Sequence, residues 1–298
     1  MSQFIKWAGG KAKLLNIIFD NVPTVIHNYH EPFLGGGSVL FEVLRKVDIG
    51  DIKITGKLYA SDINEPLIYC YINIKHNPDL LYIKLNNFYD EYDKCKTLKN
   101  KVKTRHVDTD DYMISKENYY YYIRNQYNNI DNYTTIAASA MFIFLNKTCF
   151  RGLHRMGPNG FNVPFGHYET ISKLTNGKIY EIHKIIQNVN FIHQDFEVAL
   201  SNVDCDDFIY MDPPYVEQHK TSFISYNRDG YNKHKILFDI CHLFNKKNIR
   251  FMLSNSDNMY VKDSFDVPNI TIQQIKTKHT INSKKPGNVV HELLILNF

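Results

Sequence analysis

The sequence predicts an α/β fold with a mostly parallel sheet and an inserted helical region. Short apolar runs that end at acidic or turn-forming residues, such as residues 208–211, are typical of buried strands in parallel sheets. A strand, a glycine-rich turn and a helix follow one another over residues 29–46, which is the outline of a nucleotide-binding unit. Residues 67–146 then contain successive helical segments without intervening strands. Together these observations predict helices inserted between the strands of one sheet.

Composition narrows the class of protein. With 298 residues, 44% of them hydrophobic, the chain can bury a substantial core. A net charge of +4 permits a polyanionic partner without requiring one. The 5 cysteines are odd in number and contain no Cys-x-x-Cys pair, which argues against a disulfide framework or a zinc site. No apolar run approaches the roughly 18 residues of a membrane span. We therefore expect an intracellular globular protein, by default a monomer, without a membrane or metal partner.

The most informative segment is Asp212-Pro213-Pro214-Tyr215, which directly follows the apolar run 208–211. The prolines cannot continue a hydrogen-bonded strand, so they predict a stiff loop at its carboxyl end, where open α/β sheets bind ligands. The Asp212 carboxylate and the Pro213 carbonyl can each accept one N–H of a planar amino group, which would aim the nitrogen lone pair at an electrophile. The Tyr215 ring could stack on a flat base. A strand followed by an ordinary Pro-Pro turn explains the same residues.

Two glycine-rich segments near the N-terminus indicate a ligand site. Residues 6–11 place the single tryptophan, Trp7, beside two glycines and two lysines, without the spacing of a Walker A loop. Residues 31–38 contain Glu-Pro-Phe and three consecutive glycines before a helix. This is not the dinucleotide fingerprint, so we expect a ligand with a carboxylate, such as the methionyl tail of S-adenosylmethionine. A packed indole in an ordinary loop is the alternative for the first segment.

Acidic residues end two further predicted strands. Asp62 ends a second predicted strand that begins at Tyr59, at the place from which an acid binds ribose hydroxyls in such folds. Asp195 follows the predicted strand 189–192 and could meet the adenine ring of a nucleoside. Each can also serve as the N-cap of the helix that follows it.

The helical region ends in a predicted β-hairpin over residues 147–167. Its turn is Gly-Pro-Asn-Gly, and one flank carries Arg151, His154 and Arg155. Such a ribbon can enter a major groove, where arginine reads guanine. A structural hairpin is the alternative. Earlier in the region, we interpret the lysine-rich linker 94–111 as a solvated loop and not as a phosphate contact. We interpret the tyrosine run 119–122 as packing and not as base stacking.

Jointly these motifs resemble the Dam-type (D12 class, alpha group) DNA adenine-N6 methyltransferases, over nearly the whole chain. The resemblance rests on residues 6–11, 31–38, 62–64, 146–166 and 212–215 and on the Ser-Tyr-Asn-x-Asp-Gly segment at 225–230. It implies a Rossmann-like, S-adenosylmethionine-dependent methyltransferase sheet with an inserted target-recognition domain. The catalytic domain would comprise residues 1–66 and 169–298, and the recognition domain residues 67–168.

The resemblance also implies roles for individual residues. The target adenine would be received by Asp212, Pro213 and Tyr215. With Asp195 added from its place after a strand, the expected cofactor contacts are Trp7, Lys11, Phe33, Gly35, Gly36, Gly37, Asp62, Asp195 and Asp212. The expected DNA contacts are Arg151, Leu153, Arg155 and Pro164, and Asn227 in a loop over the site.

The implied activity is transfer of a methyl group from S-adenosylmethionine to the N6 amine of an adenine flipped out of double-stranded DNA, without a metal or covalent intermediate. The target would be a short palindrome such as GATC, although family members that methylate GATC commonly carry Asn at the position of Arg151. Pairing of two monomers on DNA is compatible with such a target. Two alternatives remain: a methyltransferase acting on an RNA base or a protein amide, and a non-catalytic DNA-binding protein of the same fold.

Overall fold

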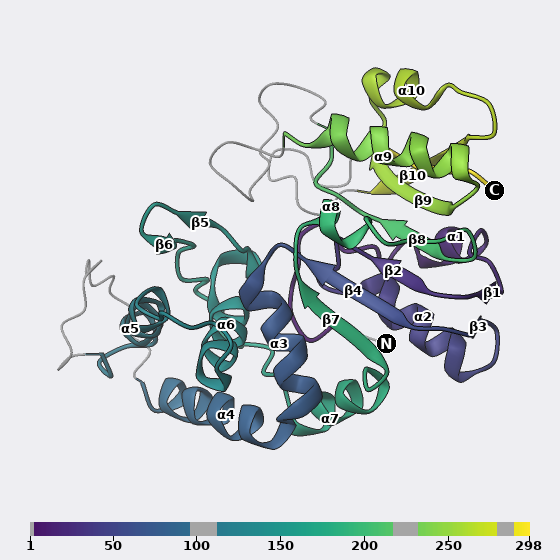
Figure 1. The fold of residues 1–298 in the computed structure, drawn as a ribbon. Helices are drawn as coiled ribbons and strands as arrows, with labels where there is room; N and C mark the ends of the chain where they lie inside the picture. The colour runs from purple at the N-terminus through teal and green to yellow at the C-terminus, as the bar shows by residue number, and fades with distance from the viewer. Residues whose placement is uncertain (1–2, 96–111, 217–231, 279–288) are drawn as a thin grey trace.

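The computed structural model describes residues 3–95, 112–216, 232–278 and 289–298. Its central feature is a seven-stranded sheet in the order β10-β11-β9-β8-β2-β4-β7 (Figure 1). The strands are β2 (Tyr29–Glu31), β4 (Leu58–Asp62), β7 (Val189–His193), β8 (Phe208–Met211), β9 (Arg250–Ser256), β10 (Thr271–Lys278) and β11 (Val289–Leu296). The five neighbouring strands β9, β8, β2, β4 and β7 are parallel, and β11 runs antiparallel to both of its neighbours. The predicted α/β class is confirmed.

The strand order reverses direction at β2. From β2 the chain crosses through α2 (Ser38–Asp48) to β4 on one side, whereas β8 pairs with β2 on the other side. The carboxyl ends of β2, β4 and β8 therefore open at a topological switch point, where ligands bind in open α/β sheets. The glycine-rich turn after β2 and the Asp-Pro-Pro-Tyr segment after β8 meet there.

Helices cover both faces of the sheet and bury two separate cores. In β8, Phe208 and Tyr210 belong to the core that includes α2 and the short α1 (Leu15–Phe19). Ile209 and Met211 alternate to the other face, which is covered by α8 (Phe196–Ala199), α9 (His234–Lys247) and α10 (Met259–Phe265). A strand that is apolar at every position is thus explained by burial on both sides.

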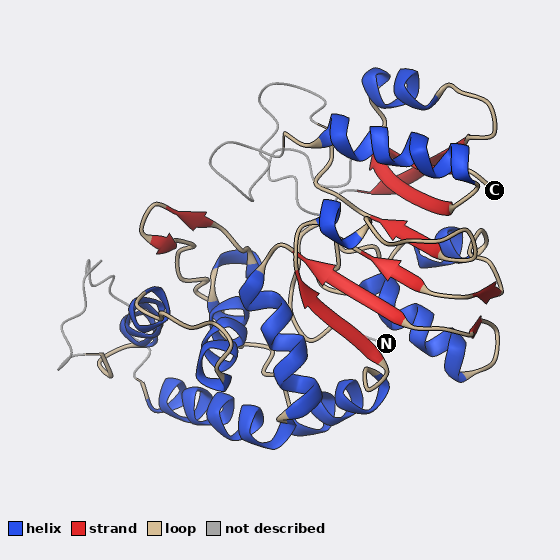
Figure 2. Ribbon diagram, in the orientation of Figure 1, coloured by secondary structure: helices blue, strands red, loops and turns tan. Residues whose placement is uncertain are grey.

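A group of helices lies beside β7, at the edge of the sheet opposite to β10 (Figure 2). It contains α3 (Glu65–His76), α4 (Pro78–Lys94), α5 (Lys116–Asn128), α6 (Ile136–Thr148) and α7 (Asn176–Ile185). The largely buried α6 packs against α3, α4 and α5. Tyr119 and Tyr120 of α5 are fully buried, so the packing interpretation of these two tyrosines is confirmed. Most of the linker 94–111 lies outside the described residues.

The predicted hairpin is shorter than the sequence suggested. Its paired strands are only β5 (Met156–Gly157) and β6 (Gly160–Phe161), preceded by a single turn, η1 (Phe150–Gly152). Farther from the turn, the two flanks are joined by a bridge between Cys149 and Phe165 and by a hydrogen bond from the Phe150 N–H to the Pro164 carbonyl. The backbone between these pairings leaves extended geometry, with φ of 58° at Arg151 and 64° at Gly152. A tight turn on an irregular ribbon replaces a regular hairpin.

Two parallel two-residue strands, β1 (Val25–Ile26) and β3 (Lys53–Ile54), pair beside the sheet. Within the described ranges, no helix is long and apolar enough to cross a membrane.

Candidate active site

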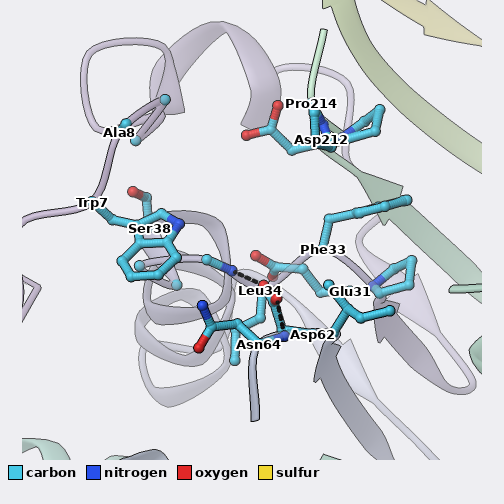
Figure 3. A pocket seen from close by; sticks show the side chains of 18 of the residues that line it. Trp7, Ala8, Glu31, Phe33, Leu34, Ser38, Asp62, Asn64, Asp212 and Pro214 are labelled. Atoms are coloured by element: carbon cyan, nitrogen blue, oxygen red, sulfur yellow. Dashed lines mark hydrogen bonds between the residues drawn. The ribbon is translucent and has the colours of Figure 1, made fainter. Parts of the chain in front are cut away.

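A cavity of about 1010 Å³ opens at the carboxyl ends of the central strands. Its wall is built from the N-terminal segment 7–14, the turn after β2, the ends of β4 and β8, and Glu292 of β11. In Figure 3, Trp7 and Phe33 stand on opposite sides of the cavity, and Asp212 lies across from Asp62 and Asn64. The structure thus brings all nine predicted cofactor residues to one cavity.

The glycine turn forms one wall because the N-terminal segment packs directly on it. A Cβ at Gly35 would lie 2.9 Å from Trp7 Cδ1, and one at Gly36 would lie 2.6 Å from Gln3 Nε2. Gly35 also has a φ of +49°, a left-handed conformation that residues with a Cβ adopt at a cost. Trp7 and the glycine turn are therefore one structural unit, although 28 positions separate Trp7 from Gly35 in the numbering.

Asp62 holds this turn in place. One carboxylate oxygen accepts the Gly35 N–H at 2.9 Å, and the other accepts the Asn64 N–H at 2.9 Å. Burial raises the pKa of the Asp62 carboxyl, while these backbone donors oppose the rise. The proposed capping role of Asp62 is wrong: the N-cap of α3 is Asn64, whose side chain accepts the Leu67 N–H at 3.0 Å.

Asp212 is paired with a cation from the other end of the chain. Lys11 Nζ lies 3.0 Å from Asp212 Oδ1 and 3.7 Å from Glu292 Oε2, and the Lys11 and Asp212 side chains are 6% and 19% exposed. Burial raises the pKa of the Asp212 carboxyl, and the Lys11 ammonium counteracts this shift. One cation thus serves two carboxylates inside the cavity.

Tyr215 lies in the same cluster. Its hydroxyl donates to Glu292 Oε2 at 2.7 Å, and the Lys11 ammonium lies over its ring at 4.8 Å from the centroid. A cation therefore covers one face of the ring, so a base that stacks on Tyr215 would have to use the other face or displace Lys11. The backbone next to Tyr215 is held by β9, because the Val216 N–H donates to Asn255 Oδ1 at 3.0 Å.

A buried acid lies between the two halves of the cavity. Glu31 ends β2, is 3% exposed and accepts the Tyr29 hydroxyl at 2.6 Å. Burial raises the pKa of Glu31 to about 8, with a smaller contribution from the charge of Asp212. At neutral pH the Glu31 carboxyl is therefore mostly protonated and can donate as well as accept.

Asp195 does cap the next helix. Its side chain accepts the Glu197 N–H at 3.0 Å at the start of α8, and its other oxygen pairs with Lys233 at 3.0 Å. Phe33 stacks on Phe196, with ring centroids 5.2 Å apart. The N-cap alternative is confirmed, and the same carboxylate also lines the cavity beside an aromatic wall.

The predicted DNA contacts lie on the ribbon that follows α6. Arg151 and Pro164 are exposed and Leu153 is half-buried. The Arg155 guanidinium is held by Asn162, with Nε 2.6 Å from Oδ1 and Nη2 3.2 Å from the carbonyl oxygen. Asn227 lies outside the described residues.

His154 does not share a surface with the two arginines. Its ring points inward and stacks on Trp7, with centroids 5.5 Å apart. Successive side chains of an extended segment point to opposite faces, so the His154 ring lies on the other face from that of its neighbour Arg155. His154 therefore lies on the Trp7 side of the ribbon, apart from the exposed Arg151.

Sequence reasoning also missed other residues of the cavity. Glu292 could have been noticed as an acid inside the apolar run 289–296 of the chain, and Glu31 as an acid that ends a buried strand. Asn64 has the N-cap signature of an Asn before Glu-Pro. Among the residues that the structure describes, no three His, Cys, Asp or Glu side chains are grouped as metal ligands.

Comparison with known proteins decides the family. A family model described as D12 class N6 adenine-specific DNA methyltransferase matches residues 7–281. The chain belongs to this family. It is 35% identical to the type II methyltransferase M.MjaIII of Methanocaldococcus jannaschii, over 99% of this chain and 98% of the relative. It is 29% identical to M1.LlaDCHI of Lactococcus lactis subsp. cremoris, covering 99% and 95%. A DNA adenine methylase of Haemophilus influenzae is also 29% identical, covering 98% and 92%.

The family gives the cavity its chemical setting. The protein is a DNA adenine methyltransferase, and its Asp212-Pro213-Pro214-Tyr215 segment opens into the same cavity as the glycine turn. A site for the amino group and a site for a methyl donor can therefore share one cavity. The structure also explains why the segments 6–11 and 31–38 belong together, since Trp7 packs on Gly35.

Proposed function

We propose that this methyltransferase transfers the methyl group of S-adenosylmethionine to the N6 amine of an adenine that has been flipped out of duplex DNA at a specific short site. The supporting observation is that Asp212, after β8, and the glycine turn, after β2, line one cavity at the switch point of the sheet. The two partners of the reaction would meet between them.

The groups that line the cavity fit the proposed cofactor in their chemistry. Gly36 and Gly37 precede the first turn of α2, where N–H groups favour a carboxylate. Asp62 and Asp195 offer acceptors for ribose and adenine groups, and Phe33 offers an apolar face. When bound, S-adenosylmethionine supplies an electrophilic methyl group on a sulfonium cation. The Asp212 carboxylate in the cavity wall suits this positive charge.

The target amine would be held by Asp212 and Pro213. The exocyclic nitrogen of adenine is a weak nucleophile because its lone pair is delocalised into the ring. Acceptance of one N–H by the Asp212 carboxylate and the other by the Pro213 carbonyl would direct the lone pair out of that system. The Asp212 carboxylate accepts well when ionised, and Lys11 at 3.0 Å supports that form. Tyr215 would contact the base and offset part of the few kcal/mol that extrusion costs.

Double-stranded DNA would be read by the irregular ribbon after α6. Arg151 and Pro164 are exposed on it, and Asn162 holds the Arg155 guanidinium in one orientation. A fixed guanidinium suits a bidentate contact with guanine. The region 67–168 would then be a target-recognition domain inserted between catalytic parts 1–66 and 169–298. We propose GATC or a related short palindrome as the target. Arg151 would decide between them, because family members that methylate GATC commonly carry Asn at its position.

The test compares Asp212→Ala with Asp206→Ala. Asp212 lines the cavity, whereas Asp206 is an exposed aspartate just before β8. Asp212→Ala should lose methyl transfer to duplex DNA by at least about 100-fold, the scale expected for a positioned group, and retain the wild-type circular dichroism spectrum. Asp206→Ala should retain activity. Equal turnover by Asp212→Ala and wild type would reject the proposed mechanism.

A further inference from the structure

His154 lies where the irregular ribbon meets the glycine turn. Its imidazole stacks on the Trp7 indole at 5.5 Å and 26°, and Phe142 and Phe161 pack against it at 5.5 and 5.8 Å. The Trp7 indole in turn packs on Gly35. The first connection from the ribbon to the glycine turn therefore runs through a stack of two aromatic rings.

A second connection runs through hydrogen bonds. Asn64 Nδ2 lies 3.4 Å from His154 Nδ1, so the amide can donate to the ring. The backbone N–H of Asn64 donates to Asp62, and the same carboxylate accepts the Gly35 N–H. His154 thus contacts the glycine turn by two routes that share only their end points, and both routes line the cavity.

Packing by itself does not explain a histidine at this position. If Nδ1 accepts from Asn64, the neutral ring carries its proton on Nε2, a buried atom without a hydrogen-bond partner in the described part of the chain. A buried donor without a partner destabilises the folded protein, and phenylalanine would avoid this loss. Burial also lowers the pKa of His154 to about 4, so the ring is neutral at pH 7 and stacks as an uncharged aromatic group.

We propose that His154 is a positioning residue that couples recognition of DNA to binding of the methyl donor, an inference that rests on the proposed function. Its chain neighbours Leu153 and Arg155 are the expected base contacts, so a shift of the ribbon on DNA moves the imidazole with it. The Trp7 indole and Asn64 follow, and both contact the unit that holds Gly35. By thermodynamic reciprocity, the same residue must let the cofactor change DNA affinity by an equal factor.

The experiment measures binding in a four-way cycle. The affinity for S-adenosylhomocysteine, which has no methyl group to transfer, is determined by calorimetry with and without a duplex that carries the target site. The same is done for His154→Leu, which removes both connections, and for His154→Phe, which keeps the ring stack and removes the Nδ1 acceptor. His76→Phe, an exposed histidine at the end of α3, is the matched control.

The wild type and His76→Phe should show a coupling factor of about 5 or more, the lower end of the range for allosteric coupling. His154→Leu should reduce it to less than about 2, and His154→Phe should give an intermediate value. Because Trp7 is the only tryptophan, its fluorescence reports the stacked pair directly. Addition of duplex without cofactor should change the emission of the wild type and leave that of His154→Leu unchanged.

Thermal unfolding of each variant is measured first, and His154→Phe carries the test if His154→Leu does not fold. Wild-type coupling that is retained in the folded His154 variants overturns this inference and leaves the proposed function intact. A wild-type coupling factor near 1 overturns it as well. A wild-type protein that binds neither S-adenosylhomocysteine nor the duplex overturns the proposed function, and this inference with it.

Discussion

Replacing Gly35 by alanine should weaken cofactor binding and destabilise the fold, because the added methyl group meets the Trp7 indole. The new Cβ would lie 2.9 Å from Trp7 Cδ1 and 3.0 Å from Nε1. A residue with a Cβ pays about 1–2 kcal/mol for the left-handed conformation at φ +49°, and forcing a methyl group into filled space costs about 1–3 kcal/mol more. The free energy of unfolding should therefore fall by about 2–5 kcal/mol.

Gly50→Ala separates these two contributions. Gly50 has a φ of +83°, and nothing lies within 4 Å of the position of its added Cβ. This variant should show only the backbone cost and keep the cofactor affinity of the wild type. Urea unfolding gives the two stability changes, and calorimetry with S-adenosylhomocysteine gives the affinities. Equal destabilisation by both substitutions, with cofactor affinity retained in Gly35→Ala, would refute the packing of Trp7 on the glycine turn.

Three further predictions concern charge and recognition. Lys11→Met leaves Asp212 and Glu292 without their shared cation, so the free energy of unfolding at pH 8 should fall by about 3–5 kcal/mol. The loss should become smaller towards pH 5, because burial raises the pKa of Asp212 and the Lys11 charge that opposes this rise is gone; a pH-independent loss would argue against the pairing. Folding raises the pKa of Glu31 from 4.5 to about 8, so between these pH values the folded protein keeps a proton that the unfolded chain has lost, and stability falls as pH rises. In urea unfolding at pH 5 and pH 8, Glu31→Gln should reduce this difference in stability between the two pH values. An unchanged difference would exclude Glu31 as its source. Arg155→Ala should reduce the discrimination between cognate and non-cognate duplexes, measured from their methylation rates, by about 1–3 kcal/mol and leave cofactor affinity unchanged. Full discrimination in the variant would show that Arg155 does not read a base.

The central parts of the site could be predicted because their signals are local in sequence. An apolar strand followed by two prolines located Asp212, and three glycines before a helix located the turn after β2. The succession of helices predicted over residues 67–146 is also found, as α3, α4, α5 and α6.

Other parts of the site depend on contacts that no local pattern contains. Glu292 reaches Lys11 because β11 lies antiparallel between β9 and β10, which brings this last strand close to the N-terminal segment that carries Lys11. His154 meets Trp7 because the ribbon packs against the N-terminal segment, where the Asn146 amide donates to the carbonyl oxygens of both Lys6 and Gly152. Asn64 rather than Asp62 caps α3 because the helix begins at Glu65, and Asn64 directly precedes it.

The central claim is that one cavity presents an adenine amine to a bound methyl donor. The most direct measurement incubates the protein with methyl-labelled S-adenosylmethionine and, in parallel reactions, with duplex DNA of diverse sequence, the matching RNA and a protein mixture. Digestion to nucleosides and mass spectrometry then identify the labelled product. We predict label in N6-methyldeoxyadenosine from duplex DNA with the wild-type protein and none with Asp212→Ala. Label on cytosine, RNA or protein amides, or equal labelling by Asp212→Ala, would contradict this claim.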